Sequence, residues 1–282
     1  MTAYKVSGAR ITEPNTVRTA DGVNLYYRDW GEGEAVVFVA GWSLTSDSWC
    51  YQMLALAEQG MRVIAYDRRG HGRSSDPGRG YDFNTLADDL AAVLEALDLD
   101  DVTLVAHSIG CNEVMRYLSR HGQRRIQRVA LLGTMTPCVL KADDNPGGID
   151  ASLLEYFRKE QLMKDLPQWI DDNLPPFVAE DTPQGMRDWL RAMPLQASLQ
   201  ALYECNRALQ YADFRAELPH ITLPVLLIAG TRDVSAPFEL TAVPTKALLP
   251  NAELRVYEGA PHGMFLTHMA QVNRDLLQFI QS

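Results

Sequence analysis

The sequence has no long hydrophobic run near its start, few cysteines and no excess of positive charge. Residues Met1–Asn15 mix charged side chains into a weakly apolar stretch, which predicts neither a signal peptide nor a membrane anchor. The formal net charge is −10 and the isoelectric point is about 5.1, so the average field repels nucleic acid and anionic membranes. We therefore expect a cytoplasmic protein that binds neither nucleic acid nor membrane.

The cysteine pattern argues against a disulfide framework and against a zinc site. Cys50, Cys111, Cys138 and Cys205 lie far apart, no two form a C-x-x-C pair, and no histidine cluster has the spacing of metal ligands. We expect Cys111 to fill space in the core. No metal or organic cofactor is expected.

The chain does have short apolar runs that alternate with longer helical patterns. With 282 residues, of which 46% are hydrophobic and 22% charged, this alternation is typical of an α/β fold with a mostly parallel sheet. Residues 16–19 and 24–29 flank Asp21-Gly22, a tight-turn pair that predicts an antiparallel hairpin at the sheet edge. Buried parallel strands are expected at residues 35–40, 62–66, 102–106, 128–133, 225–229 and 253–257, and helices at residues 48–59, 84–97, 109–120, 238–248 and 267–280. Together they predict eight strands with helices on both faces, the second helix being capped by Asn84.

Residues 135–219 break this rhythm. They contain no strand-like run, and short helical patterns rich in Leu, Met, Trp and Gln are separated by prolines. A structureless loop of this length is improbable inside a compact domain, so we expect a helical insert. Its place between two strands puts it over their carboxyl ends, where α/β proteins bind ligands. We predict a core domain of residues 1–134 and 220–282 and a helical cap (lid) of residues 135–219.

Ser108 lies in Ala106-His107-Ser108-Ile109-Gly110, between an expected strand and an expected helix. A serine nucleophile sits on such a turn, and small residues two positions away on either side prevent collisions with neighbouring backbone. The usual pattern is G-x-S-x-G, and Ala106 departs from it by one methyl group. The alternative interpretation is a buried serine at the start of a helix.

A serine nucleophile needs a histidine base that is itself oriented by a carboxylate. His262 follows the last expected strand and has small neighbours, and Asp233 follows the strand before it. Ser108, Asp233 and His262 stand in the chain order of α/β-hydrolases. A solvated loop histidine and a surface aspartate are the alternatives. His107 is expected to point away from the nucleophile.

A tetrahedral intermediate requires two N–H donors for its oxyanion. We expect the amides of Ile109, at the start of the helix, and of Trp42, in the turn Gly41-Trp42-Ser43. The Trp42 indole is also expected to wall the pocket. Apolar cap side chains are further candidates for the acyl pocket, or alternatively for the core of the cap: Leu153, Phe157, Trp169, Phe177, Trp189 and Met193.

On these motifs the chain resembles the α/β-hydrolases, and most of all the cofactor-free haloperoxidase and arylesterase branch, which includes perhydrolases and γ-lactamases. The similarity extends from the hairpin to the last helix and is strongest in residues 62–74 and 113–122. It implies that Ser108, Asp233 and His262 are nucleophile, acid and base.

The resemblance is weaker at the oxyanion turn. The branch usually has His-Gly-Trp-Pro there, whereas this chain has Ala40-Gly41-Trp42-Ser43. In the branch that proline is associated with hydrogen peroxide as the acyl acceptor, so its replacement by serine favours hydrolysis over perhydrolysis.

The expected function is that of a serine hydrolase which cleaves a small, mostly apolar carboxylic ester or lactone through an acyl-enzyme. A carbon–carbon bond hydrolase and a perhydrolase or haloperoxidase are alternatives on the same triad, and a hydrolase-fold ligand sensor is an alternative from another class. Dehalogenases and epoxide hydrolases require a carboxylate where this chain has Ser108. Monomer and homo-oligomer are both compatible with the sequence.

Overall fold

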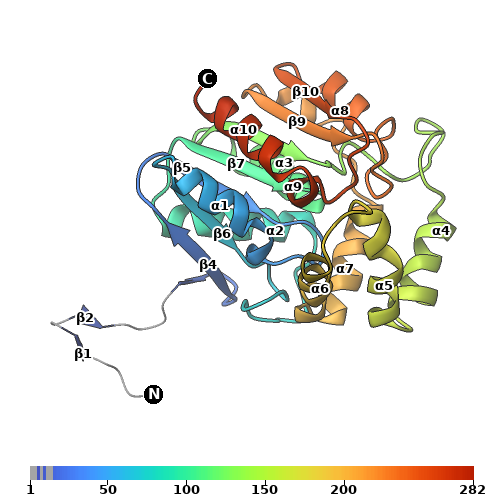
Figure 1. Cartoon of the computed structure of the whole chain (residues 1–282), viewed down its shortest axis with the longest axis horizontal. Coiled ribbons are helices and arrows are strands. Elements are labelled where there is room, and N and C mark those ends of the chain that lie inside the picture. The colour runs from blue at the N-terminus through green and yellow to red at the C-terminus, as the bar shows by residue number, and fades with distance from the viewer. Residues whose placement is uncertain (1–4, 7–8, 11–14) are drawn as a thin grey trace.

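The computed structural model describes residues 5–6, 9–10 and 15–282, and its main feature is one eight-stranded sheet (Figure 1). The strand order is β10-β9-β8-β7-β5-β6-β4-β3. β3 and β4 form the expected antiparallel hairpin, β4 also pairs antiparallel with β6, and the remaining pairs are parallel. The strands are β3 (Thr16–Arg18), β4 (Asn24–Trp30), β5 (Ala35–Val39), β6 (Arg62–Tyr66), β7 (Val102–His107), β8 (Ile126–Leu132), β9 (Val225–Gly230) and β10 (Ala252–Tyr257). The predicted mostly parallel sheet is confirmed.

A separate pair of short strands, β1 (Lys5–Val6) and β2 (Ala9–Arg10), is antiparallel. Most of Met1–Asn15 lies outside the described residues, so the prediction that this stretch carries no signal peptide stays a prediction. In the described part of the chain, no helix combines the length and the apolar character that crossing a membrane requires.

Helices cover both faces of the sheet (Figure 1). One face carries α1 (Cys50–Ala57) and α10 (Met269–Ile280), and the other carries α2 (Phe83–Ala96) and α3 (Ile109–His121). The remaining elements of the core are the 3₁₀ helices η1 (Ser46–Trp49) and η4 (Leu218–His220) and the short helices α8 (Ala242–Leu248) and α9 (Met264–Thr267).

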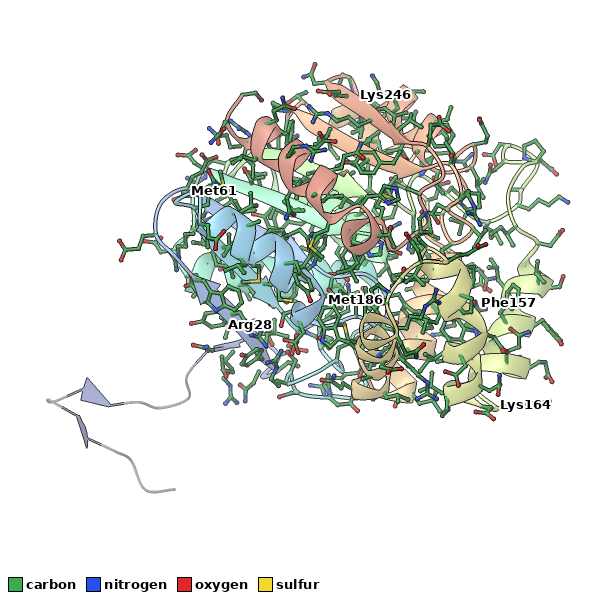
Figure 2. The ribbon with its side chains drawn as sticks, in the orientation of Figure 1. Arg28, Met61, Phe157, Lys164, Met186 and Lys246 are labelled. Carbon is green, nitrogen blue, oxygen red and sulfur yellow. The ribbon has the colours of Figure 1, made fainter. Side chains whose placement is uncertain are left out.

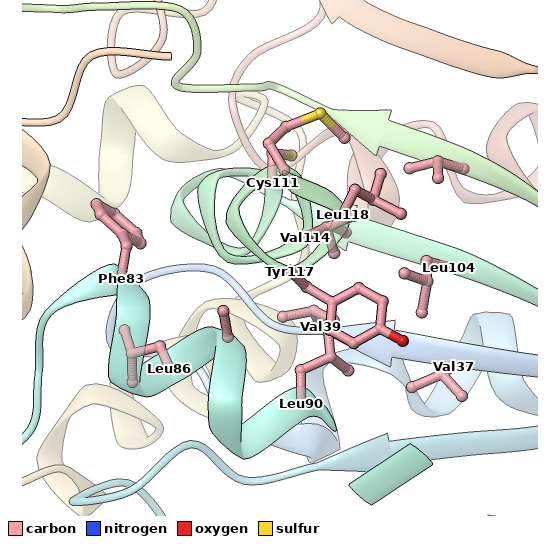
Figure 3. Packing of buried hydrophobic residues seen from close by; sticks show 14 of the residues in the cluster. Val37, Val39, Phe83, Leu86, Leu90, Leu104, Cys111, Val114, Tyr117 and Leu118 are labelled. Atoms are coloured by element: carbon pink, nitrogen blue, oxygen red, sulfur yellow. The ribbon is translucent and has the colours of Figure 1, made fainter. Parts of the chain in front are cut away.

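Alternate strand residues supply two separate hydrophobic clusters. Val37 and Leu104 pack with α2 and α3 (Figure 3), whereas their neighbours Val36 and Val105 pack with α1 and α10. Side chains alternate between the faces of a strand, so a strand that is covered on both faces must be apolar throughout. Each fully buried Val or Leu contributes about 1.5–3 kcal/mol relative to an exposed one. Cys111 is also fully buried, and burial raises the pKa of its thiol, in agreement with a packing role.

The helix ends differ from the prediction at several places, among them the following three. The cap of α2 is Asp82, whose carboxylate accepts from the amides of Asn84 and Thr85, because the helix starts one residue before Asn84. The helix expected from residue 238 begins at Ala242. The last predicted helix is interrupted at His268, which separates α9 from α10.

The segment between β8 and β9 is helical, as predicted. It contains α4 (Ala151–Tyr156), the π-helical turn η2 (Phe157–Leu162), α5 (Leu166–Phe177), α6 (Gln184–Ala192), the 3₁₀ turn η3 (Pro194–Gln196) and α7 (Leu199–Gln210). We call these elements the cap helices. They gather at one end of the sheet (Figure 1). The division of the chain into a core domain and a cap domain remains a prediction.

Candidate active site

Ser108 occupies the sharp turn between β7 and α3. Its backbone angles are φ 56° and ψ −124°, a region that costs a non-glycine residue about 1–3 kcal/mol. Two residues later, a Cβ on Gly110 would lie 2.7 Å from the carbonyl oxygen of Val39 and 2.8 Å from that of Ala40. The turn therefore requires glycine at position 110, as the motif predicts.

His262 and Asp233 form a buried hydrogen-bonded pair. The distance from His262 Nδ1 to Asp233 Oδ2 is 2.7 Å, and both side chains are at most 5% exposed. The other carboxylate oxygen of Asp233 accepts from the amides of Ser235 and Ala236. A carboxylate accepts this hydrogen bond, so His262 Nδ1 is the donor and Nε2 is the ring nitrogen that remains for another partner. Ser108 and His262 line the same cavity.

A buried arginine holds the turn that contains Trp42. Arg68 donates from Nη2 to the carbonyl oxygen of Ala40 at 2.6 Å and from Nη1 to that of Gly41 at 3.1 Å. Its Nε donates to Glu113 on α3, and both side chains of this ion pair are at most 3% exposed. The Gly41 carbonyl belongs to the same planar peptide as the Trp42 amide. Arg68 thus orients the amide that the sequence predicts as an oxyanion donor.

The prediction that His107 points away from the nucleophile is wrong, because the ring lines the same cavity as Ser108. Its Nε2 donates to the carbonyl oxygen of His262 at 3.0 Å, and the two rings lie 4.5 Å apart. A carbonyl only accepts, so the proton is on Nε2. Burial and then the nearby His262 lower the pKa of His107 well below its usual value, and the ring stays neutral.

The cavity has a volume of about 220 Å³. Three of the predicted wall residues line it: Trp42, Trp169 and Phe177. The indole of Trp42 meets that of Trp169 edge-on at 5.0 Å, and its Nε1 donates to the carbonyl oxygen of Leu202 on α7. Phe177 packs edge-on against the His262 ring at 5.6 Å. Aromatic side chains from the core and from the cap helices therefore enclose the space above Ser108.

The other four predicted wall residues lie outside this lining. Leu153 and Phe157 are 46% and 41% exposed, and Figure 2 shows Phe157 on the side of the cap helices away from the sheet. Trp189 packs edge-on against Tyr51 of α1, and Met193 is buried between the cap helices and the core. The physical reason is that a helix turns only one face toward a cavity, and these residues stand on other faces.

The remaining lining residues come from segments far apart in the chain. Ile170, Asn173 and Leu174 follow Trp169 on one face of α5, and helical periodicity counted from Trp169 identifies them. The others carry no comparable local signal: Ser43, Leu44, Met135, Leu190, Pro194, Asn206, Leu209 and Ser235.

The cap helices are tied directly to the loop that carries His262. The Gly263 amide donates to the carbonyl oxygen of Phe177 at 2.8 Å, at the end of α5. A main-chain bond at this point sets the position of Phe177 relative to His262. Within the described residues, no group of three or more His, Cys, Asp or Glu side chains is arranged to hold a metal ion.

Comparison with known proteins identifies the family. The alpha/beta hydrolase fold family matches residues 34–269. The chain belongs to this family. A non-heme chloroperoxidase of Streptomyces lividans is 41% identical over 276 residues, which cover 95% of this chain and 99% of the relative. A bifunctional esterase/perhydrolase of Acinetobacter calcoaceticus is 36% identical, with coverages of 94% and 99%.

A solved structure supports the same assignment for this α/β-hydrolase. The bromoperoxidase from Bacillus anthracis superimposes with a TM-score of 0.90 at 36% identity, and the match covers 95% of this chain and 99% of that one. The resemblance to the haloperoxidase branch is thereby confirmed, and the chain is an enzyme with a hydrolase fold.

Proposed function

We propose that this α/β-hydrolase cleaves small, mostly apolar carboxylic esters or lactones, with Ser108 as nucleophile, His262 as general base and Asp233 as the residue that orients the base. The single observation that carries the proposal is the buried 2.7 Å contact from Asp233 to His262 Nδ1. It leaves His262 Nε2 free to accept a proton, and His262 and Ser108 share one cavity.

The steps follow from these positions. His262 Nε2 takes the Ser108 hydroxyl proton while Oγ attacks the substrate carbonyl carbon, and the amides of Trp42 and Ile109 stabilise the oxyanion. The first amides of a helix lack intrahelical acceptors, so that of Ile109 is available as a donor. His262 then protonates the leaving alcohol. Water, deprotonated by the same nitrogen, releases the acyl group from Ser108.

The cavity supports a small substrate. Its volume of about 220 Å³ lies below the usual range for drug-sized ligands, about 300–1,000 Å³. Most of its lining is apolar. A relative named as an esterase among the similar proteins agrees with an ester substrate.

Perhydrolysis is the second candidate, because the same relative is also named as a perhydrolase. The oxyanion turn argues for water as the main acceptor. Ser43 has φ 64°, whereas proline requires about −65°, so the conformation of this turn is incompatible with the proline of the branch. Replacing Ser43 with proline would therefore force the turn into a different backbone conformation. A cleaner measurement is the ratio of peracid to carboxylic acid that the unaltered enzyme forms in hydrogen peroxide, and we expect carboxylic acid to predominate.

The test of the proposed function is hydrolysis of a series of 4-nitrophenyl esters with acyl chains of two to eight carbons. We expect Ser108→Ala to lower kcat by about 10⁴-fold or more, because nucleophile and base act as a unit. Its melting temperature should match that of the unaltered protein. A correctly folded Ser108→Ala protein that still turns over the esters at the original rate would overturn the mechanism.

A further inference from the structure

A buried arginine in the cap helices has no carboxylate partner. Arg158, in the π-helical turn η2, is only 4% exposed. Its Nη1 donates to Asn206 Oδ1 at 3.2 Å and its Nη2 donates to Gln210 Oε1, both on α7. Its Nε has no partner within the described residues. An arginine is always charged. The full positive charge of Arg158 therefore lies against α7, and its hydrogen-bond partners there are two neutral side-chain amides.

The other fully buried arginines show how unusual this arrangement is. Arg68 pairs with Glu113, and Arg69 pairs with Asp89. Among the described residues, no carboxylate lies within ion-pair distance of Arg158. The charge of Arg158 interacts with the exposed Glu155, and its guanidinium carbon lies 6.0 Å from the centre of the Tyr203 ring, but it has no close counter-ion. A buried charge without a close counter-ion is unfavourable, and a π-helical turn often marks a functional site. Both features point to a negative charge that arrives with a ligand.

Asn206 connects this charge to the cavity. It lines the cavity, although Arg158 does not. A guanidinium only donates, so the amide oxygen of Asn206 must face Arg158 and its Nδ2 hydrogens remain for the cavity. Asn173, the other asparagine in the lining, differs because its Nδ2 already donates to the carbonyl oxygen of Trp169. No Asp or Glu is among the described lining residues to repel an anion.

We propose that the substrate of this enzyme carries a carboxylate, remote from the carbonyl that Ser108 attacks, and that this carboxylate accepts from Asn206 Nδ2 in the field of Arg158. This inference rests on the proposed function and names its substrate class. A charge-assisted hydrogen bond is stronger than a neutral one, and the positive charge behind the amide strengthens it further. The mostly apolar cavity then holds the chain between the two ends of the substrate.

The experiment compares two esters of equal shape, 4-nitrophenyl hydrogen adipate and 4-nitrophenyl 6-methylheptanoate, in which an isopropyl group replaces the carboxylate. We expect kcat/KM to be about tenfold or more higher for the adipate. Asn206→Leu removes the donors, and Arg158→Met removes the charge and its desolvation cost. Either change should lower the adipate preference, which is the ratio of kcat/KM for the adipate to kcat/KM for the methylheptanoate, about fivefold or more. Melting temperatures establish that both variants fold.

Asn173→Leu is the matched control, because it makes the same change at a lining asparagine whose Nδ2 already uses one of its two hydrogens in the bond to the Trp169 carbonyl oxygen. Its adipate preference should stay within about twofold of the unaltered enzyme. An unaltered enzyme without adipate preference would overturn the inference, and so would an equal loss of preference in Asn173→Leu and Asn206→Leu.

Equilibrium binding of both esters to the Ser108→Ala protein separates this inference from the proposed function. If that protein binds the adipate more tightly and Asn206→Leu abolishes the difference, the carboxylate subsite holds even if Ser108 is not the nucleophile. Equal binding of the two esters would contradict the subsite and leave the serine mechanism standing.

Discussion

The loops at the carboxyl edge of the sheet and the cap helices are stabilised in different ways. At the sheet edge the Arg68–Glu113 ion pair and the hydrogen bond between His262 and Asp233 are both buried. The ion pairs of the cap helices are exposed, and large apolar side chains such as Tyr156 and Met163 are 53% and 44% exposed. The groups proposed to perform the reaction are therefore held rigidly, whereas those that select the substrate lie on helices with much solvent-facing surface.

Two of the polar contacts that join the two regions lie beside the cavity. The Trp42 indole donates to the carbonyl oxygen of Leu202, and the Gly263 amide donates to that of Phe177. The first contact lies in the turn Gly41-Trp42-Ser43 and the second in the loop that carries His262. Changes elsewhere in the cap helices should consequently alter selectivity with little effect on the geometry around Ser108.

The largest difference between the two regions is expected from removing one arginine in each. Arg68→Met leaves Glu113 buried without its cation, which should lower the free energy of unfolding by about 3–5 kcal/mol. Arg191→Met breaks the exposed pair with Asp171 and should cause no measurable change. Urea unfolding of both variants provides the measurement. Equal losses of unfolding free energy would show that the exposed Arg191–Asp171 pair stabilises the protein as much as the buried Arg68–Glu113 pair does.

A smaller difference is expected from adding one methyl group in each region. At Gly110 the new Cβ would collide with two backbone carbonyls, so Gly110→Ala should destabilise the fold by about 1–3 kcal/mol. At Gly185 in α6 a Cβ meets nothing within 4 Å, and Gly185→Ala should stabilise the helix by about 0.5–1 kcal/mol. Thermal unfolding tests both, and a stable Gly110→Ala protein would argue against the tight turn at Ser108.

The same contrast explains which features could be read from the sequence. The strands and the turn at Ser108 were predictable because apolar runs and small residues at fixed spacing have local causes. The cavity wall was predicted less well. Trp169 lies in the lining and Trp189 does not, although both are cap tryptophans, because the orientation of each helix is set by packing between distant segments.

His107 and Asn206 show a second limit of sequence-based prediction. The backbone contact from His107 to His262 and the bond from Arg158 to Asn206 join residues 155 and 48 positions apart. No spacing rule relates such positions. Their roles became visible only when the donors and acceptors of each buried side chain were matched.

The core and the cap helices are expected to respond differently to acid, because the core contains two buried histidines, His71 and His107. His71 donates from Nδ1 to the carbonyl oxygen of Arg69, and burial, followed by the charge of Arg68, lowers the pKa of His71 to about 3. The pKa of His107 is also lowered, mainly by burial. The segment 135–219 contains no histidine, so this response arises in the core.

The smallest effect that we predict is a pH dependence of the free energy of unfolding, to which His71 contributes. Above the unfolded-state pKa of about 6.5 both histidines are neutral in either state, and below it only the unfolded chain takes up protons. The free energy of unfolding should fall with decreasing pH, by up to about 1.4 kcal/mol per pH unit for each histidine. His71→Gln should reduce this slope between pH 6.5 and 5.5, whereas His220→Gln, at an exposed position, should leave it unchanged. Urea unfolding across this range measures the slope, and an identical slope in His71→Gln would mean that the buried ring is protonated as readily as a solvated one.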